Sequence, residues 1–214
     1  AWSRGRELRA CPLCPFRSVP VREMALECAF QKKVENMEET FDAITDFGLN
    51  SRNYHFVKFF LARITHFIEN KSSLHGQSVE TYLSNKPKPF EIEHIIANHS
   101  ERFGKEYISE EEFQKFRNSI GALVLLPRGF NQSFQDDEYE KKLPHYYSQN
   151  LLASSLNSQC YLKNPSFLHF VKDTSLPFEA YKSFGKEEIQ KRCELLKAIC
   201  GKIWHAELFR EVLL

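Results

Sequence analysis

Hydrophobic residues recur every three or four positions along most of this chain, the spacing that gathers them on one face of a helix. Glycine, proline and polar clusters separate these stretches and mark the turns between them. In residues 51–70, for example, the apolar positions share one face and leave Lys58, Arg63 and Glu69 for solvent. The pattern predicts helices over residues 21–47, 51–70, 79–83, 110–119, 134–142, 145–157 and 186–204.

Two short stretches have a different pattern. Residues 90–96 are rich in isoleucine and follow two prolines, and residues 122–127 form a continuous apolar run that ends at a proline. Short apolar runs bounded by turn residues are typical of strands. We therefore predict two strands, with a loop and a helix between them and a turn and a helix after the second. Pro144 is expected to interrupt the chain after that helix, and residues 164–186 are expected to form loops.

These elements predict a mainly α-helical α+β fold, in which a helical scaffold holds an embedded core of two strands and a helix. Residues 1–86 would form an N-terminal helical region, residues 87–142 the core, and residues 143–214 a C-terminal helical region that packs on the same core. Because the chain begins with alanine and a basic stretch, we expect the first region to be the C-terminal piece of a longer chain's linker or scaffold.

Composition narrows the functional classes. A chain of 214 residues with 42% hydrophobic residues is long enough to bury a full core. The net charge of +1 means that overall charge attracts neither nucleic acid nor membrane, so any basic binding surface must be local. No apolar run approaches the roughly 18 residues of a membrane span, and the N-terminus has no secretion-signal pattern. We expect a cytoplasmic protein with no membrane partner.

The six cysteines are few for a secreted disulfide scaffold of this length, so reduced thiols are expected. Cys11 and Cys14 form a CxxC pair, but no second pair or close histidine pair follows to complete a tetrahedral zinc site. An exposed proline-rich turn is the simpler interpretation. A zinc site there, in a nucleic-acid adaptor protein, is retained as an alternative.

One stretch carries candidate chemistry. FEIEHIIANHS places Glu91, Glu93 and His94 among isoleucines, where burying charge is costly and a core strand gains nothing from it. With this stretch, IGALVLLPRGFNQSF and the terminal EEIQKRCELLKAICGKIW follow in order. Together they resemble the C-terminal HNH nuclease domain of GmrSD-type restriction endonucleases, a member of the ββα-metal superfamily. The resemblance covers roughly residues 53–204, and it implies that the embedded core is a ββα-metal (HNH) core.

The resemblance also implies roles for individual residues. Phosphodiester hydrolysis needs a base that activates water and a hard cation that neutralises charge on the phosphate. His94 would be the base, and Glu93 and Asn131 would hold Mg²⁺ or Mn²⁺, with Asn131 counted among the catalytic residues. Adjacent strand residues point to opposite faces, so Glu93 and His94 can serve one site only if the strand bends or ends there. Accessory roles are assigned to Glu91 and His99, and contacts with DNA phosphates to Arg128, Lys141 and Lys142.

Two residues depart from the family pattern. Ala122 stands where the family has the asparagine of its GNL motif, and Ala97 stands where it has a proline. The asparagine is better interpreted as a loop brace than as a metal ligand, so its loss should loosen the histidine loop without necessarily ending activity. These departures motivate the main alternative, a catalytically degenerate HNH-fold module that binds DNA or a partner protein without cutting.

The expected function is therefore a metal-dependent DNA endonuclease or nickase in a bacterial restriction system that acts against phage DNA, including modified DNA. Double-stranded DNA would be the partner. The resemblance also implies an upstream ParB-like, nucleotide-dependent domain on the full-length chain. Simpler interpretations stand beside this one: a Glu-His pair is often a surface pair, an asparagine such as Asn131 is often a turn residue or helix cap, and Lys141 can belong to a solvated helix face.

Overall fold

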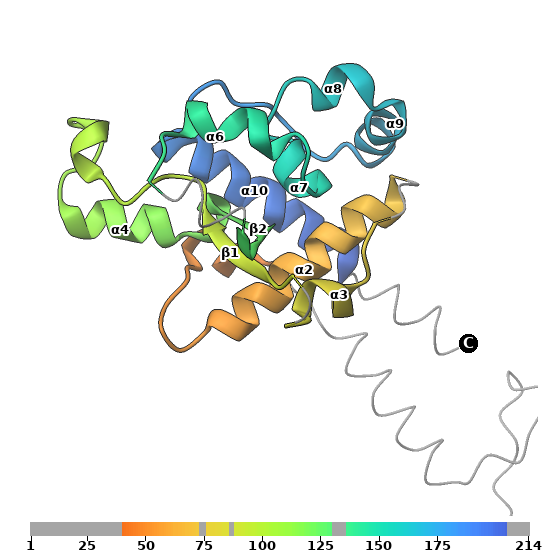
Figure 1. Ribbon diagram of the computed structural model, residues 1–214, viewed down its shortest axis with the longest axis horizontal. Helices are drawn as coiled ribbons and strands as arrows, with labels where there is room; N and C mark the ends of the chain where they lie inside the picture. Colours follow the sequence, from red (N-terminus) through yellow and green to blue (C-terminus); the bar gives the residue numbers. More distant parts are fainter. Residues whose placement is uncertain (1–39, 73–75, 86–87, 130–135, 205–214) are drawn as a thin grey trace, which may run out of the picture. The chain divides into compact units, whose positions relative to one another are not determined.

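The computed structural model describes residues 40–72, 76–85, 88–129 and 136–204. It is mainly helical with one two-stranded sheet, which confirms the predicted mainly α-helical α+β class (Figure 1). The division into regions at residues 86 and 142 stays a prediction. The elements are η1 (Asp42–Asp46), α2 (Tyr54–Lys71), α3 (Val79–Leu83), β1 (Phe90–His94), η2 (Ser100–Phe103), α4 (Glu110–Asn118), η3 (Ile120–Ala122), β2 (Leu123–Pro127), α6 (Tyr139–Tyr146), α7 (Leu151–Ser154), α8 (Cys160–Lys163), α9 (Pro165–Thr174) and α10 (Lys186–Ile203).

The two strands pair antiparallel, with Glu93 opposite Val124 and His94 opposite Leu123. Strand β1 is two residues shorter than predicted because the chain bends after His94. One further main-chain hydrogen bond continues the pairing past the end of β1, where the Ile95 amide donates to the Ala122 carbonyl at 2.9 Å. The strand pairing therefore fixes the backbone on both sides of His94.

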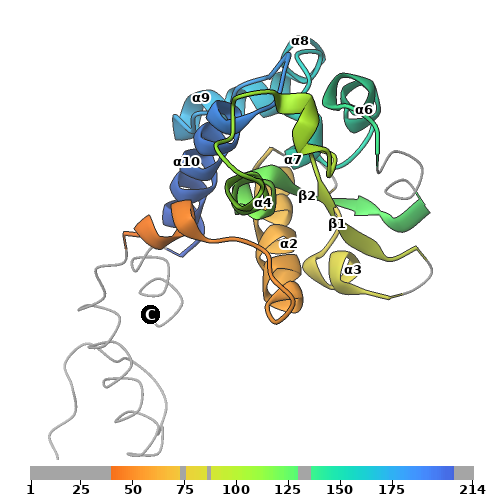
Figure 2. The ribbon, with the colours of Figure 1, turned by 90° about the vertical axis from the view of Figure 1, so that its left-hand side faces the viewer.

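Helices cover the two-stranded sheet and complete the hydrophobic core. Helix α2 contacts β2, and helix α10 contacts both η1 and the turn η3 that leads into β2. Figure 2 shows α10, α4 and α2 on one side of the sheet and α6 on another. Residues 123–126 of β2 are completely buried or nearly so, as expected for a strand covered on both faces. The sheet is thus an internal element, and the helices determine where its ends lie.

The contact between α10 and η3 is unusually close. A β-carbon added to Gly121 would lie 2.3 Å from the Ile189 carbonyl oxygen and 2.8 Å from the Cys193 sulfur, so only glycine fits there. From the same helix, the buried Arg192 side chain donates through Nε to the Gly121 carbonyl at 2.8 Å and through Nη2 to the Leu123 carbonyl at 3.5 Å. Helix α10 therefore clamps the start of β2 through its backbone.

Several predicted boundaries hold and several are wrong. The Ser109 hydroxyl caps α4 by accepting from the Glu112 amide at 3.2 Å, as its position predicts. Helix α6, in contrast, starts later than predicted and continues through Pro144, which removes only one internal hydrogen bond from so short a helix. In the pattern predicted over 145–157, residues 145 and 146 belong to the end of α6, and only Leu151–Ser154 form a separate helix, α7. The predicted helix over 21–47 lies mostly outside the described residues, and its end is the 3₁₀ turn η1.

Two further predictions are corrected. Helix α9 occupies part of the expected loop over 164–186, because the Asn164 side chain caps it and Pro165 fits its first turn. On α2, Lys58 and Glu69 are buried although their face was predicted to be solvated. The Glu69 carboxylate accepts from the Tyr82 hydroxyl at 2.8 Å and from the Leu151 amide at 3.2 Å. Tertiary partners therefore satisfy a charge that the helical pattern assigns to solvent.

A pair of glycine substitutions tests the clamp. Gly121→Ala should lower the free energy of unfolding by roughly 1 to 3 kcal/mol, because the new methyl group has backbone atoms of α10 in its way. Gly201 lies on α10 itself, and a β-carbon added to it would have no atom within 4 Å. Gly201→Ala should instead raise the free energy of unfolding by about 1 kcal/mol. Chemical denaturation of both variants measures the difference. Equal effects of the two substitutions would contradict the close approach.

Candidate active site

A buried ion pair joins the end of β1 to α6. The Lys142 ammonium donates to Glu93 Oε1 at 2.7 Å and to the main-chain oxygen of His94 at 3.1 Å. Lys142 is 1% exposed and Glu93 is 4% exposed. Lys142 lies on the inward face of α6 with Tyr139 and Tyr146, which is why a lysine of this helix reaches the strand. Its ammonium group therefore serves Glu93 inside the protein, in place of the predicted surface contact with DNA.

A second hydrogen bond orients His94. Its Nε2 lies 3.0 Å from Asn118 Oδ1, at the end of α4, and Asn118 Nδ2 donates to the Gln114 carbonyl at 2.8 Å. Because a carbonyl only accepts, the Gln114 bond fixes which end of the amide is nitrogen, and the oxygen must face His94. Nε2 therefore carries the proton in the neutral ring, and Nδ1 carries the lone pair.

Glu93 and His94 contact different helices, as adjacent residues of a strand should. The predicted condition for a shared site is met in one respect, since β1 ends at His94. The two side chains also share their electrostatic surroundings, because the charges of Arg117 and Lys142 act on both of them. Arg117 itself makes no hydrogen bond or ion pair with the residues that the structure describes, and its Nε is buried.

Burial changes the protonation of both residues. It lowers the pKa of His94 to about 4, assisted by the nearby positive charge of Arg117 and only partly opposed by the hydrogen bond that His94 donates to Asn118. His94 is thus a neutral imidazole at pH 7. Burial also raises the pKa of the Glu93 carboxyl, and the adjacent Lys142 opposes that shift. Lys142 therefore compensates for the cost of keeping a carboxylate in this position.

The other predicted residues are more scattered. Glu91 of β1 pairs with Arg128, which follows β2, at 3.4 Å between Oε1 and Nε. His99 pairs through Nδ1 with Glu101 at 2.7 Å and not with His94. Lys141 is exposed on α6, where a contact with DNA stays a prediction. Asn131, Cys11 and Cys14 lie outside the described residues.

The donors near His94 fit a hard cation in type. Glu93 Oε1 is held by Lys142, whereas Oε2 makes no hydrogen bond with the described residues. Magnesium is usually held by one or two carboxylates with water and phosphate oxygens, so one such oxygen is a sufficient start. In the described part of the chain, no three His, Cys, Asp or Glu side chains gather to hold a metal on their own.

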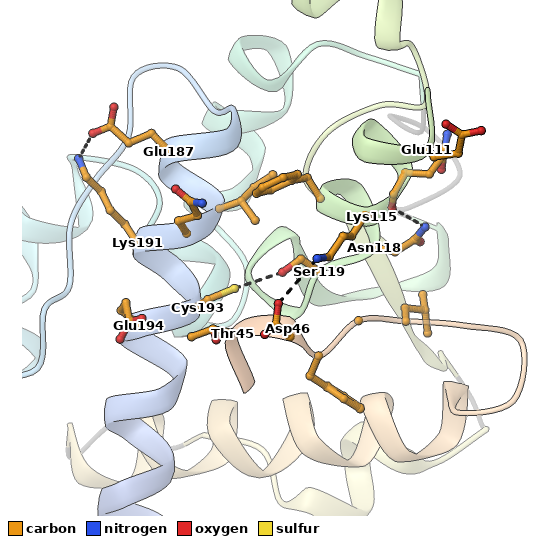
Figure 3. Close-up of a pocket in the computed structure, with 17 residues that line it drawn as sticks. Thr45, Asp46, Glu111, Lys115, Asn118, Ser119, Glu187, Lys191, Cys193 and Glu194 are labelled. Carbon is orange, nitrogen blue, oxygen red and sulfur yellow. Dashed lines mark hydrogen bonds and ion pairs between the residues drawn. The ribbon is translucent and has the colours of Figure 1, made fainter. Parts of the chain in front are cut away.

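A pocket lies between the end of α4 and α10, next to this cluster at Asn118. It has a volume of about 900 Å³ and is lined by residues of α4, α10 and the segment around η1. Figure 3 shows Ser119, which follows α4, next to Cys193 of α10, and the Ser119 hydroxyl lies 3.1 Å from the Cys193 sulfur. Neither Glu93 nor His94 lines this pocket, so it reaches the candidate site only through Asn118.

Comparison with known proteins decides the family. The family model for the C-terminal domain of GmrSD restriction endonucleases matches residues 34–199. The chain belongs to this family. No curated protein and no solved structure matches the sequence. Membership of this family implies that the chain is a nuclease of the restriction-endonuclease type and that DNA is its substrate. Among the described helices of this domain, none is both long and apolar enough to cross a membrane.

Two residues of the candidate site were missed in the sequence. Asn118 and Arg117 end a predicted amphipathic helix, where polar residues are ordinarily assigned to solvent. The signal that was present is position, because the helix ends directly before the turn that leads into the second predicted strand. A residue at that point necessarily lies near the start of β2, which is paired with the end of β1.

Removing the buried cation should be costly. Lys142→Met leaves the Glu93 carboxylate buried without its partner, which should lower the free energy of unfolding by about 3 to 5 kcal/mol. Lys141→Met, which removes an exposed charge from the neighbouring position, should change it by at most about 0.5 kcal/mol. Urea denaturation in EDTA makes the comparison. Adding Glu93→Gln to Lys142→Met should recover part of the loss, and equal stabilities of the two lysine variants would refute the pair.

The neutral state of His94 should appear as a pH dependence of stability. Its folded pKa of about 4 lies below the ordinary value of 6.5, so the unfolded chain binds the proton more readily. The contribution is complete above pH 6.5 and is lost as the pH falls towards 4. We expect the stability advantage of the native chain over His94→Asn to shrink by roughly 2 to 3 kcal/mol across that window, measured in EDTA. A constant difference would show that His94 is not buried as a neutral ring.

Proposed function

We propose that this domain is a metal-dependent DNA endonuclease or nickase of the HNH type, in which His94 is the general base. The observation that carries the proposal is the neutral His94 ring, held through Nε2 by Asn118 beside a buried carboxylate. A base must be unprotonated at working pH, which the lowered pKa of His94 supports, and the Asn118 bond at Nε2 leaves the lone pair on Nδ1. The order of strand, strand and helix in β1, β2 and α6 supports the HNH assignment.

In the proposed reaction, His94 Nδ1 takes a proton from a water molecule. The water oxygen attacks phosphorus, a new P–O bond forms, and the bond from phosphorus to the 3′ oxygen breaks. Asn118 keeps the ring in the tautomer that can accept this proton. Arg117 is the described cation beside Glu93 and His94 that has no partner of its own, so we assign it to the phosphate oxygens.

Glu93 and Asn131 would hold Mg²⁺ or Mn²⁺. When bound, such an ion neutralises charge on the phosphate and on the leaving 3′ oxygen. Lys142 would keep the Glu93 carboxylate ionised and oriented, with one oxygen left for the ion. Arg128 and Lys141 are proposed to contact the DNA backbone on either side.

The proposed biological role is restriction of phage DNA, including modified DNA, in the bacterial cytoplasm. An upstream ParB-like, nucleotide-dependent domain on the full-length chain would act together with the nuclease domain. Membership of the GmrSD family supports a role in restriction. The choice of DNA modification belongs to surfaces outside the Glu93 and His94 cluster.

A binding module that does not cut is the second candidate. It is favoured by the occupation of Glu93 Oε1 by Lys142 and by the low exposure of the carboxylate, which leave little room for a cation. Ala97 and Ala122, both buried, depart from the family pattern in the same region. Such a module would bind DNA with or without a metal ion.

Cleavage of DNA distinguishes these candidates. The native chain should nick or linearise supercoiled plasmid, or phage DNA with modified bases, when Mg²⁺ or Mn²⁺ is added, and His94→Ala should lose at least about 100-fold in rate. His169→Ala removes an exposed histidine of α9 and should cut at the native rate. Gel analysis over time provides the rates, and circular dichroism checks that both variants fold.

The outcomes separate clearly. Loss of cutting in folded His94→Ala supports the nuclease with its proposed base. DNA binding by all three proteins without cutting, also when the assay is repeated on the chain with its full upstream sequence, supports the binding module. Equal cutting by native protein and His94→Ala would remove His94 from the mechanism.

A further inference from the structure

A second pocket lies beside the start of β1, away from His94. It has a volume of about 500 Å³ and is lined by the first turns of α2, the end of α3, the start of β1 and Arg128, which follows β2. In Figure 2, α3 lies beside α2. A pocket of this size lies within the range that holds small ligands or a single nucleotide.

The pocket contains a buried cation that no described residue neutralises by contact. Lys58 lines it and is 7% exposed, yet it makes no hydrogen bond or ion pair with the described part of the chain. Burial lowers the pKa of Lys58, and the more distant charge of Glu91 partly opposes this shift. An ammonium group held in this way is suited to an anion that arrives from outside.

A second cation and two aromatic rings complete the lining. Arg128 is held there by its amide, which donates to the Pro89 carbonyl at 2.9 Å, and its side chain is paired only loosely with Glu91. Tyr54 and Phe59 leave 37% and 43% of their surface exposed. Positive groups interleaved with exposed rings are the combination that binds nucleotides, phosphate to the cation and base to the ring.

Strand β1 connects this pocket to the candidate active site. Glu91 lines the pocket, and Glu93 follows two positions later on the same face of β1. Two strand residues span about 7 Å, which corresponds to about two base-pair rises of 3.4 Å along the axis of duplex DNA. A nucleotide in the pocket would therefore lie close to the phosphate at Glu93.

We infer that this pocket is a nucleotide subsite of the DNA substrate, in which Lys58 and Arg128 bind a backbone phosphate and Tyr54 and Phe59 stack on its base. The inference rests on the proposed function, since it names the part of the substrate that lies about two nucleotides from the cut. It assigns to Lys58 a role that neither its helix position nor the sequence pattern suggests.

Binding without cleavage tests the subsite. Fluorescence anisotropy with labelled single- and double-stranded oligonucleotides is measured in EDTA over a series of KCl concentrations. Lys58→Met should weaken binding about 3- to 10-fold, and it should reduce the slope of log affinity against log salt by about 0.7 to 0.9, the value of one phosphate contact. Methionine preserves the buried aliphatic chain, so thermal denaturation should show no loss of stability. Lys172→Met, an exposed charge on α9, is the matched control and should leave the slope unchanged.

The rings are tested separately. Phe59→Leu keeps an apolar side chain and removes the ring, and it should weaken binding of single strands about fivefold or more without changing the salt slope. An unchanged affinity and slope in folded Lys58→Met, or no DNA binding by the native chain, would overturn the subsite. If the plasmid is not cut but Lys58→Met still lowers DNA affinity, the nuclease falls and the subsite stands. If the plasmid is cut and Lys58→Met binds DNA like the native chain, the nuclease assignment stands and the subsite falls.

Discussion

The candidate site depends on the hydrogen bonds from Arg192 to the main chain at the start of β2. A guanidinium group that is 1% exposed would be costly without compensation, and the carbonyl oxygens of Gly121 and Leu123 supply it. Those bonds require α10 to approach the turn so closely that only glycine fits at position 121. Since Leu123 pairs with His94, the helix that carries Arg192 also determines where the histidine lies.

Charge in the site is unbalanced in a direction that suits its proposed substrate. Glu93 faces one cation in contact, Lys142, and a second nearby, Arg117, while His94 is neutral. In the described residues this leaves an excess of positive charge around a base that bears none. A phosphate group would relieve that imbalance, and like any nearby negative charge it would raise the pKa of His94 from about 4 towards the working pH. The arrangement thus favours anionic substrate and neutral base together.

The sequence predicted the mainly α-helical α+β class of the fold and singled out the two residues at the centre of the candidate site, because both leave strong local signals. Apolar spacing identified α2, α4 and α10, and the charged pair in an isoleucine-rich strand identified Glu93 and His94. The same spacing assigned Lys142, Lys58 and Glu69 to the surface. Helical periodicity shows which positions are polar, but it does not show which tertiary contacts bury them. Helix α9 was missed because Asn164 and Pro165 suit a loop as well as a helix start. Arg117 and Asn118 were missed because their role depends on pairing between strands that are distant in sequence.

The alanine at position 122 illustrates how a missing side chain is compensated by the backbone and a neighbour. Its carbonyl accepts from the Ile95 amide, a bond that any residue at this position can make, and its methyl group is completely buried. The chain after His94 is therefore held without an asparagine there. The ring is held by Asn118, whose own amide is fixed by the Gln114 carbonyl within the same helix. The departure expected to loosen the histidine loop consequently removes one side chain from a region that retains two independent constraints, one on the backbone and one on the imidazole.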